Sequence, residues 1–235
     1  MDRLDTKKLV RSLTVHQGQI LAPLIDQFLA RGKFPPTWEL TIENKKEWDP
    51  HFHPSSDVFT DPDILYLDKT KQLKRQSISA SLRKTFDVGH MWHRYIQNVL
   101  VEMGLVHPDN VERPLLKKIV SIDGQDFFGR GTADLVDVHI PGHGYWLVDI
   151  KTMNKDNFQS PLEATMNKYF AQVNLYGAWL GTDKMLILGV CKDSPHDFRE
   201  WIVPRDEATI EEIYMRWTIA ANGIAKKRLP SEILS

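Results

Sequence analysis

Apolar residues recur at helical spacing in four stretches of the chain, and each stretch is expected to form a helix. These stretches cover residues 4–31, 80–105, 161–180 and 206–226. Gly32 follows the first stretch and Gly181 follows the third, and a glycine in this place is typical of a helix C-terminus. The third stretch also begins with a capping signature, in which Ser160 is the N-cap, Pro161 the first helical residue and Glu163 the end of a capping box.

Between these helices, shorter apolar runs that are bounded by turn residues predict strands. Five strands are expected, at residues 112–122, 126–139, 145–151, 184–191 and 198–203. Asp123-Gly124 forms a turn between the first two strands, and residues 141–144 (PGHG) form a turn between the next two. The order of helices and strands predicts an α/β domain with a mixed central sheet flanked by helices.

Residues 33–77 break this regularity, because they are rich in Pro, Asp, His and Trp and show no sustained period. So long an irregular segment in a compact protein is usually functional or poorly ordered. We therefore divide the chain into residues 1–78, a helical and irregular extension packed on the core, and residues 79–235, the α/β core.

Composition narrows the class of protein. The chain has 30 Lys and Arg against 31 Asp and Glu, so its net charge of −1 gives no global signal for a polyanionic partner, although it allows a local basic face. A single cysteine, Cys191, excludes an internal disulfide and any site built from several cysteines, and it fits a reducing compartment. Without a signal peptide or an apolar run of about 20 residues, we expect a cytoplasmic protein with no membrane partner.

Candidate chemistry lies on two adjacent predicted strands. Asp149 and Lys151 are two residues apart, so they point to the same face of their strand. The turn at residues 141–144 makes the two strands antiparallel neighbours, and Asp134 can therefore approach Asp149. A lone Asp-x-Lys is most often a surface ion pair, but here it follows the apolar run 145–148 (YWLV), and charges on an interior strand need an explanation.

A divalent cation would explain this arrangement, because two close carboxylates repel and are costly to bury without a counter-charge. Oxygen ligands suit Mg²⁺ or Mn²⁺. Such an ion can activate water and bind a scissile phosphate, while Lys151 either orients the water or stabilises the negative charge of the transition state.

Four motifs in order along the chain resemble the PD-(D/E)XK nuclease superfamily, specifically its RecB-like exonuclease branch. They are Gly89 to His93 (G-x-x-x-H), Gly129 to Asp137 (GRGTADLVD), Val148 to Thr152 (VDIKT) and Gln172 to Tyr176 (Q-x-x-x-Y). The resemblance covers about residues 80–190, and residues 51–56 (HFHPSS) are more loosely similar to phage-encoded members.

The resemblance implies a restriction-endonuclease-like sheet and a role for each matching residue. His93, Asp134, Asp149 and the backbone carbonyl of Ile150 would bind one or two Mg²⁺ or Mn²⁺ ions. Lys151 would be the catalytic lysine, and Gln172 and Tyr176 would hold that lysine or the DNA backbone. Some relatives carry an iron–sulfur cluster bound by four cysteines, which this chain cannot build.

The implied function is a metal-dependent DNA exonuclease that acts on ends or single strands. Its setting would be the cytoplasm of a bacterium or of a phage-infected host, with a recombination or replication protein as a candidate partner. Two alternatives stay open: a non-catalytic nucleic-acid-binding or assembly module on the same fold, and a structure-specific endonuclease.

Basic clusters near the site are candidates for a phosphate track, although each cluster alone is usually a solvated face. They include Lys69, Lys71, Lys74, Arg75, Arg83 and Lys84. Trp38, Trp48 or Trp92 could stack on unpaired bases, although core packing is the commoner role of a tryptophan.

Three further residues have both a structural and a functional interpretation. His90 and His93 have a spacing that can bind zinc, but no third ligand is identifiable, and we favour His93 alone as a ligand. Glu112 could approach the metal from the preceding strand, but we favour a structural role for it. Asp137 could bind substrate, but an exposed strand position is its default interpretation.

Overall fold

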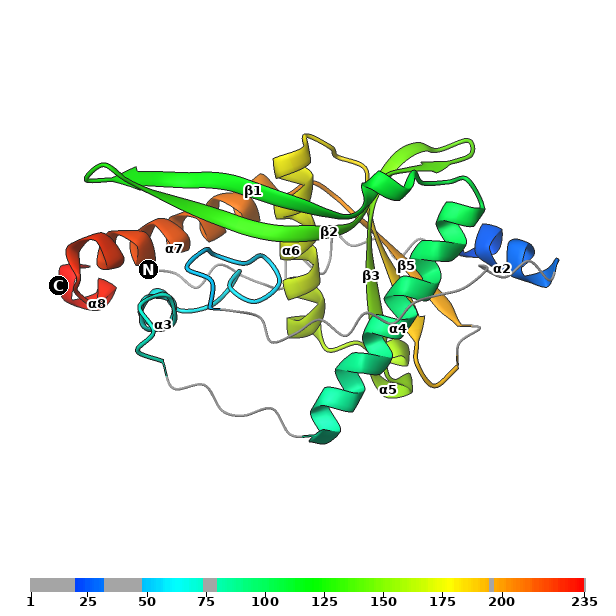
Figure 1. The fold of residues 1–235 in the computed structure, drawn as a ribbon, viewed down its shortest axis with the longest axis horizontal. Coiled ribbons are helices and arrows are strands. Elements are labelled where there is room, and N and C mark those ends of the chain that lie inside the picture. Colours follow the sequence, from blue (N-terminus) through cyan, green and yellow to red (C-terminus); the bar gives the residue numbers. More distant parts are fainter. Residues whose placement is uncertain (1–19, 32–47, 74–79, 195–196, 235) are drawn as a thin grey trace.

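The computed structural model describes residues 20–31, 48–73, 80–194 and 197–234 (Figure 1). A five-stranded sheet lies at its centre, with the strands side by side in chain order. The strands are β1 (Val111–Ile122), β2 (Gln125–Ile140), β3 (Gly144–Met153), β4 (Met185–Cys191) and β5 (Phe198–Val203). β3 and β4 are parallel, and the other neighbours are antiparallel. The predicted α/β class with a mixed central sheet flanked by helices is confirmed.

The helices that were predicted from long periodic patterns are present. They are α4 (Ala80–Glu102), α6 (Glu163–Leu180) and α7 (Glu207–Lys226), together with α2 (Ala22–Ala30) from the described part of the first stretch. The predicted start of α6 is wrong, because its N-cap is Leu162, which makes no side-chain capping bond. Its predicted end is confirmed, since Gly181 has the left-handed conformation that glycine adopts without strain.

Four short elements were not predicted: α3 (Pro62–Lys69), α5 (Lys155–Gln159), α8 (Pro230–Leu234) and a 3₁₀ turn at Pro108–Asn110. An element of five to eight residues spans too few turns to show a helical period in the sequence. The local signal is a cap instead: Asp61 accepts the Asp63 N–H at the start of α3, and Asn154 accepts the Asn157 N–H at the start of α5.

Different helices cover the two faces of the sheet. On one face, Val148 and Ile150 of β3 belong to an apolar cluster with Ile96 and Leu100 of α4 and with residues of α2. On the other face, Leu147 of β3 belongs to a second cluster, which includes Phe170 and Tyr176 of α6. Consecutive residues of β3 therefore serve opposite faces, as the alternation of side chains along a strand requires.

β2 is longer than its neighbour β3, and the sheet forks where the pairing of these two strands ends. It pairs with β3 between Leu135 and Ile140, whereas its pairing with β1 continues to the tip of the hairpin. The hairpin extends over α7 in Figure 1. There Phe52 bridges to Gly129 of β2 and stacks on Trp217 of α7, with ring centroids 5.3 Å apart.

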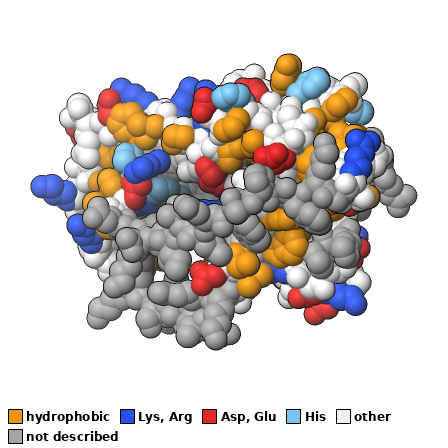
Figure 2. All heavy atoms as spheres, turned by 45° about the vertical axis from the view of Figure 1, so that its right-hand side comes forward, with side chains coloured by type: hydrophobic (Ala, Val, Ile, Leu, Met, Phe, Trp, Pro, Cys, Tyr) orange, Lys and Arg blue, Asp and Glu red, His pale blue; other side chains and the backbone are white. Residues whose placement is uncertain are grey.

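The surface carries charges of both signs. On the face drawn in Figure 2, acidic, basic and histidine side chains are interspersed with apolar ones. This mixture agrees with a net charge of −1. Within the described ranges, no helix has the length and hydrophobicity needed to cross a membrane.

Candidate active site

Asp134 lies at the fork, immediately before the point where β2 begins to pair with β3. With no β2 backbone beside it, the N–H of Ile150 donates instead to Asp134 Oδ2, at 2.7 Å. The N–H and C=O of one strand residue point to the same side, so the Ile150 carbonyl also faces the fork. The predicted approach of Asp134 to β3 is therefore present, and it depends on the two strands separating here.

Asp149 and Lys151 of β3 form the predicted same-face pair, with Asp149 Oδ2 2.8 Å from Lys151 Nζ. The pair is not a surface ion pair, because Asp149 is 1% exposed and the Lys151 side chain 14%. Apart from this contact with Lys151, the two Asp149 carboxylate oxygens have no hydrogen-bond partner in the described part of the chain. Burial of a carboxylate with so few polar partners is costly, and a bound cation at this position would offset that cost.

α6 fixes the position of Lys151. The ammonium donates to Gln172 Oε1 at 3.1 Å, and Gln172 Nε2 in turn donates to the Tyr176 hydroxyl at 3.4 Å. Gly131 of β2 allows this arrangement, because a Cβ there would lie 2.7 Å from the Tyr176 ring. Tyr176 is 2% exposed, which leaves it no surface for a direct contact with DNA. That part of the prediction is corrected: Tyr176 supports Gln172 from the interior.

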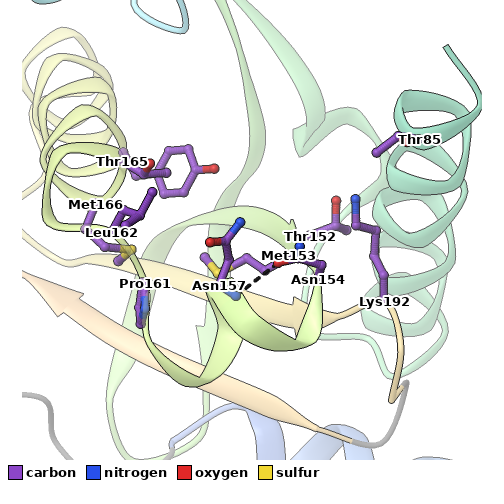
Figure 3. A pocket seen from close by; sticks show the side chains of 11 residues that line it. Thr85, Thr152, Met153, Asn154, Asn157, Pro161, Leu162, Thr165, Met166 and Lys192 are labelled. Atoms are coloured by element: carbon purple, nitrogen blue, oxygen red, sulfur yellow. Dashed lines mark hydrogen bonds between the residues drawn. The ribbon is translucent and has the colours of Figure 1, made fainter. Parts of the chain in front are cut away.

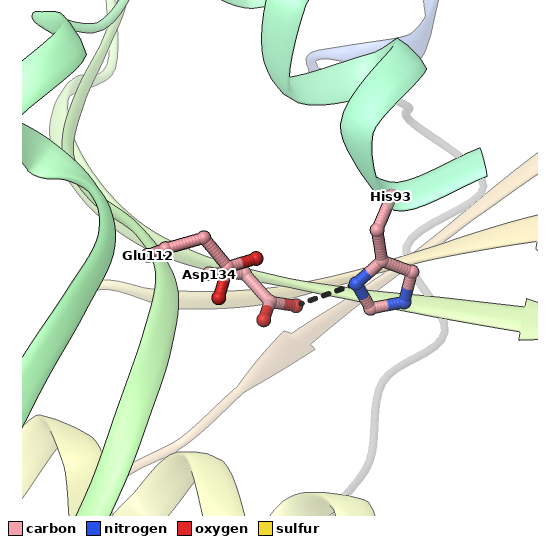
Figure 4. Close-up of side chains that lie close together, drawn as sticks. All are labelled: His93, Glu112 and Asp134. Carbon is pink, nitrogen blue, oxygen red and sulfur yellow. Dashed lines mark ion pairs between the residues drawn. The ribbon is translucent and has the colours of Figure 1, made fainter. Parts of the chain in front are cut away.

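His93 reaches the fork from α4. Its Nδ1 lies 3.5 Å from Asp134 Oδ2 (Figure 4). Gly89, one turn earlier, allows α4 to lie close to β3, since a Cβ there would be 3.0 Å from Thr152 Oγ1. The G-x-x-x-H motif therefore has a physical basis, in which the glycine sets the approach of the helix and the histidine reaches the site. His90 is exposed and is not part of this group.

Glu112 of β1 completes the group, although the sequence favoured a structural role for it. Ligand atoms of His93, Glu112 and Asp134 all lie within 4.8 Å of one another (Figure 4). Glu112 has a φ of +51°, which is uncommon for a residue with a side chain, and its carboxylate accepts a 2.6 Å hydrogen bond from Gln97 Nε2. Sequence spacing could not reveal this geometry, because it depends on a left-handed residue and on a partner from α4.

Burial dominates the electrostatics of the site. Burial raises the pKa of Asp134 and of Asp149 to about 6, against the opposing effect of Lys151. Burial, and next the charge of Lys151, lowers the pKa of His93 to about 4, so its imidazole is neutral near pH 7. Burial would also lower the pKa of Lys151, but Asp149 and Asp134 outweigh it and raise that pKa, so the lysine remains an ammonium.

This donor set fits a divalent cation. Three carboxyl groups face a single ammonium, and His93, which is neutral near pH 7, offers a nitrogen ligand. Asp149 adds buried oxygens that have no hydrogen-bond partner among the described residues apart from their contact with the Lys151 ammonium. Oxygen ligands with one imidazole suit Mg²⁺ or Mn²⁺.

The predicted basic track is only partly described. Lys74 and Arg75 lie outside the described residues, and so does Trp38. Arg83 and Lys84 lie in the first turns of α4, where the side chains are not described. Lys69 is wrong as a phosphate contact, because it is 5% exposed and paired with Asp57 at 2.8 Å.

The predicted aromatic contacts and Asp137 can also be placed. Trp92 is partly buried against the α4 side of the core, whereas Trp48 is 41% exposed and lies under Lys71. Asp137 is exposed, as expected, and has a φ of +55° where β2 changes register against β3.

No family model and no curated protein matches the sequence. Among solved structures, that of SSO0001 superposes with a TM-score of 0.48 at 18% identity, covering 87% of each chain. The alkaline exonuclease LHK-Exo from Laribacter hongkongensis gives a TM-score of 0.46 at 15% identity, over 76% of this chain and 89% of that one. Its complex with dAMP gives 0.48 at 15% identity, over 79% and 95%. A likeness of this size does not by itself assign a function.

Proposed function

We propose that this protein is a divalent-metal-dependent nuclease of the PD-(D/E)XK type that hydrolyses phosphodiester bonds in DNA, at ends or in single strands. One observation carries the proposal: His93, Glu112 and Asp134 converge at the fork, and Asp149, which interacts electrostatically with Asp134 and His93, pairs with the ammonium of Lys151. Metal-ligating and cationic groups next to each other are what phosphodiester hydrolysis requires, since negative charge develops in its transition state.

Asp134, Asp149, Glu112, His93 and the Ile150 carbonyl are the groups that would hold the metal. When bound, Mg²⁺ or Mn²⁺ supplies Lewis acidity to the phosphodiester and lowers the pKa of water. The protein's contribution is a rigid donor set, because β1, β2, β3 and α4 each supply part of it.

Lys151 acts as a fixed positive charge rather than as a base. Its pKa is raised by Asp149 and Asp134, so it has no free lone pair with which to accept a proton. Gln172 holds the ammonium through its side-chain oxygen, and Tyr176 fixes the orientation of the Gln172 amide. The ammonium is thereby placed to stabilise the negative charge that forms on the phosphate oxygens.

Digestion of end-labelled linear single- and double-stranded DNA tests the proposal, with Mn²⁺, with Mg²⁺ and with EDTA. We expect metal-dependent release of short products, loss of activity in Lys151→Ala, and retained activity in Lys155→Ala, whose residue is exposed on α5. DNA binding without cleavage in Mn²⁺ would favour a non-catalytic module. Cutting of covalently closed circles would indicate an endonuclease.

A further inference from the structure

A cavity of about 210 Å³ adjoins the site at the C-terminal end of β3 (Figure 3). Leu162, the N-cap of α6, forms one wall with Thr165 and Met166 of that helix, while Lys192 lies on the other side near Thr85 of α4. Residues from the end of β3 and from α5 lie between the two walls. The cavity therefore lies among the elements that position the site.

Two residues connect the cavity directly with Lys151. Tyr169 lines the cavity, and the Lys151 ammonium lies 5.0 Å from the centroid of its ring. Thr152, the next residue of β3, also lines the cavity. A group that enters the cavity from the fork would thus pass beside the reacting phosphate.

The walls combine apolar, amide and cationic groups. Leu162 is 64% exposed although it is a leucine, and Met166 and the Tyr169 ring add further apolar surface. Asn157 contributes an amide. Lys192 has no ion pair within the described ranges, and its backbone N–H is fixed by a 2.7 Å bond to the carbonyl of Met153. An aromatic and apolar surface beside an unpaired cation is complementary to a base and a phosphate.

We propose that this cavity binds one nucleotide of the DNA strand, the one next to the scissile phosphate. The base of this nucleotide contacts Tyr169 and Leu162. The phosphate on its other side, which is not the scissile one, binds Lys192. At about 210 Å³ the cavity is smaller than the pockets of about 300–1,000 Å³ that hold drug-sized ligands, so it has room for the base of one nucleotide and not for a base pair. The inference rests on the proposed function and specifies the substrate as an unpaired strand.

The salt dependence of DNA binding tests the role of Lys192. Binding of a labelled oligo(dT) would be measured over a range of salt concentrations, with Ca²⁺ in place of Mn²⁺. We expect Lys192→Gln to weaken binding and to make the slope of log K against log salt shallower by about 0.7, the value for one phosphate contact with a single strand. Lys168→Gln, at an exposed position on α6 outside the cavity, should leave the slope unchanged. Equal slopes for both variants and wild type would overturn the phosphate contact.

A variant that fills the cavity tests whether a DNA base binds there. Thr165→Trp puts a large ring into the cavity, whereas Ala164→Trp adds the same ring at an exposed neighbouring position that does not line it. Stacking is worth about 1–3 kcal/mol per base, so loss of the base contact should weaken oligo(dT) binding about 5- to 150-fold in Thr165→Trp alone. Circular dichroism would verify the fold of both variants. Unchanged binding by a folded Thr165→Trp variant would contradict the proposal.

These outcomes are distinct from failure of the proposed function. If wild-type protein binds oligo(dT) but does not cleave it in Mn²⁺, the nuclease proposal fails, and the Lys192 slope still decides whether the cavity is a nucleotide site. If wild-type protein does not bind oligo(dT), the cavity proposal is overturned as well.

Discussion

At the scale of residues, the site residues on β2 and β3 could be predicted from the sequence. The contribution of Glu112 on β1, and of Gln97 on α4 that holds it, could not. Asp134, Asp149 and Lys151 followed from side-chain alternation and one turn, both of which are local properties of the sequence. Glu112 did not, because its backbone is left-handed and its carboxylate is held by Gln97, fifteen residues away on α4. Gln97 itself is 3% exposed and carries no motif, so only the structure reveals it as a positioning residue.

Replacing Gln97 tests that role. We expect Gln97→Ala to lower the affinity for Mn²⁺ about 10- to 100-fold, the usual cost of losing a group that orients a metal ligand. Isothermal titration calorimetry would measure the affinity. Gln159→Ala, at an exposed position at the end of α5, is the matched control. An affinity for Mn²⁺ equal to that of the control would show that Glu112 does not depend on Gln97 or does not bind the metal.

At the scale of elements, the long helices and the strands that lie within the described residues were predicted, whereas residues 4–19 of the first predicted helix lie outside them. Contacts between distant elements were not predicted. The N-terminus of α2 illustrates the difference. Glu200 of β5 is 4% exposed, and its carboxylate accepts the backbone N–H groups of Ile20, Leu21 and Ala22. This carboxylate satisfies donors that a helix start leaves unpaired and it complements the helix dipole. No local pattern could pair a strand residue with a helix about 180 positions earlier in the chain.

Removing this charge should loosen α2. We expect Glu200→Gln to lower the free energy of unfolding by about 1–3 kcal/mol, because several charge-assisted hydrogen bonds at a buried helix start are weakened. Urea unfolding followed by circular dichroism would measure the change. Glu207→Gln removes an exposed carboxylate and should change the stability by less than about 0.5 kcal/mol. Equal urea midpoints for the two variants would contradict the capping role.

At the scale of the whole molecule, the balance of charges hides a local imbalance. The chain is nearly neutral, but Asp149, the most deeply buried carboxylate of the described residues, interacts electrostatically with Asp134 at the fork. The overall class was predictable, because the order of elements restricts the architecture. The fork was not, since it depends on β2 leaving β3 to form the long hairpin with β1. The division of the chain at residues 78 and 79 stays a prediction.

The response of thermal stability to metal and pH tests the buried charges together. In the metal-free fold, the raised pKa values of Asp134 and Asp149 mean that both carboxyls bind protons as the pH falls below about 6. Mn²⁺ must displace those protons, so binding weakens at low pH. His93, with a pKa of about 4, stays neutral at both pH 7.5 and pH 5 and adds no competing proton.

We therefore expect Mn²⁺ to raise the Tm clearly at pH 7.5 and to raise it much less at pH 5, where its affinity should be about 10- to 100-fold lower. Differential scanning calorimetry with Mn²⁺ and with EDTA would measure both values. A Tm increase of the same size at the two pH values would show that the metal does not bind these carboxyls.

The most direct test of the central claim is the rate of single-turnover cleavage of end-labelled single-stranded DNA in Mn²⁺. Asp149→Asn should reduce the rate by at least about 1,000-fold, because it removes the buried charge that the metal site requires. Asp137→Asn, an exposed change on β2 where asparagine tolerates the left-handed backbone, should keep the wild-type rate. A wild-type cleavage rate in a folded Asp149→Asn variant would contradict the assignment of this fork as the site of hydrolysis.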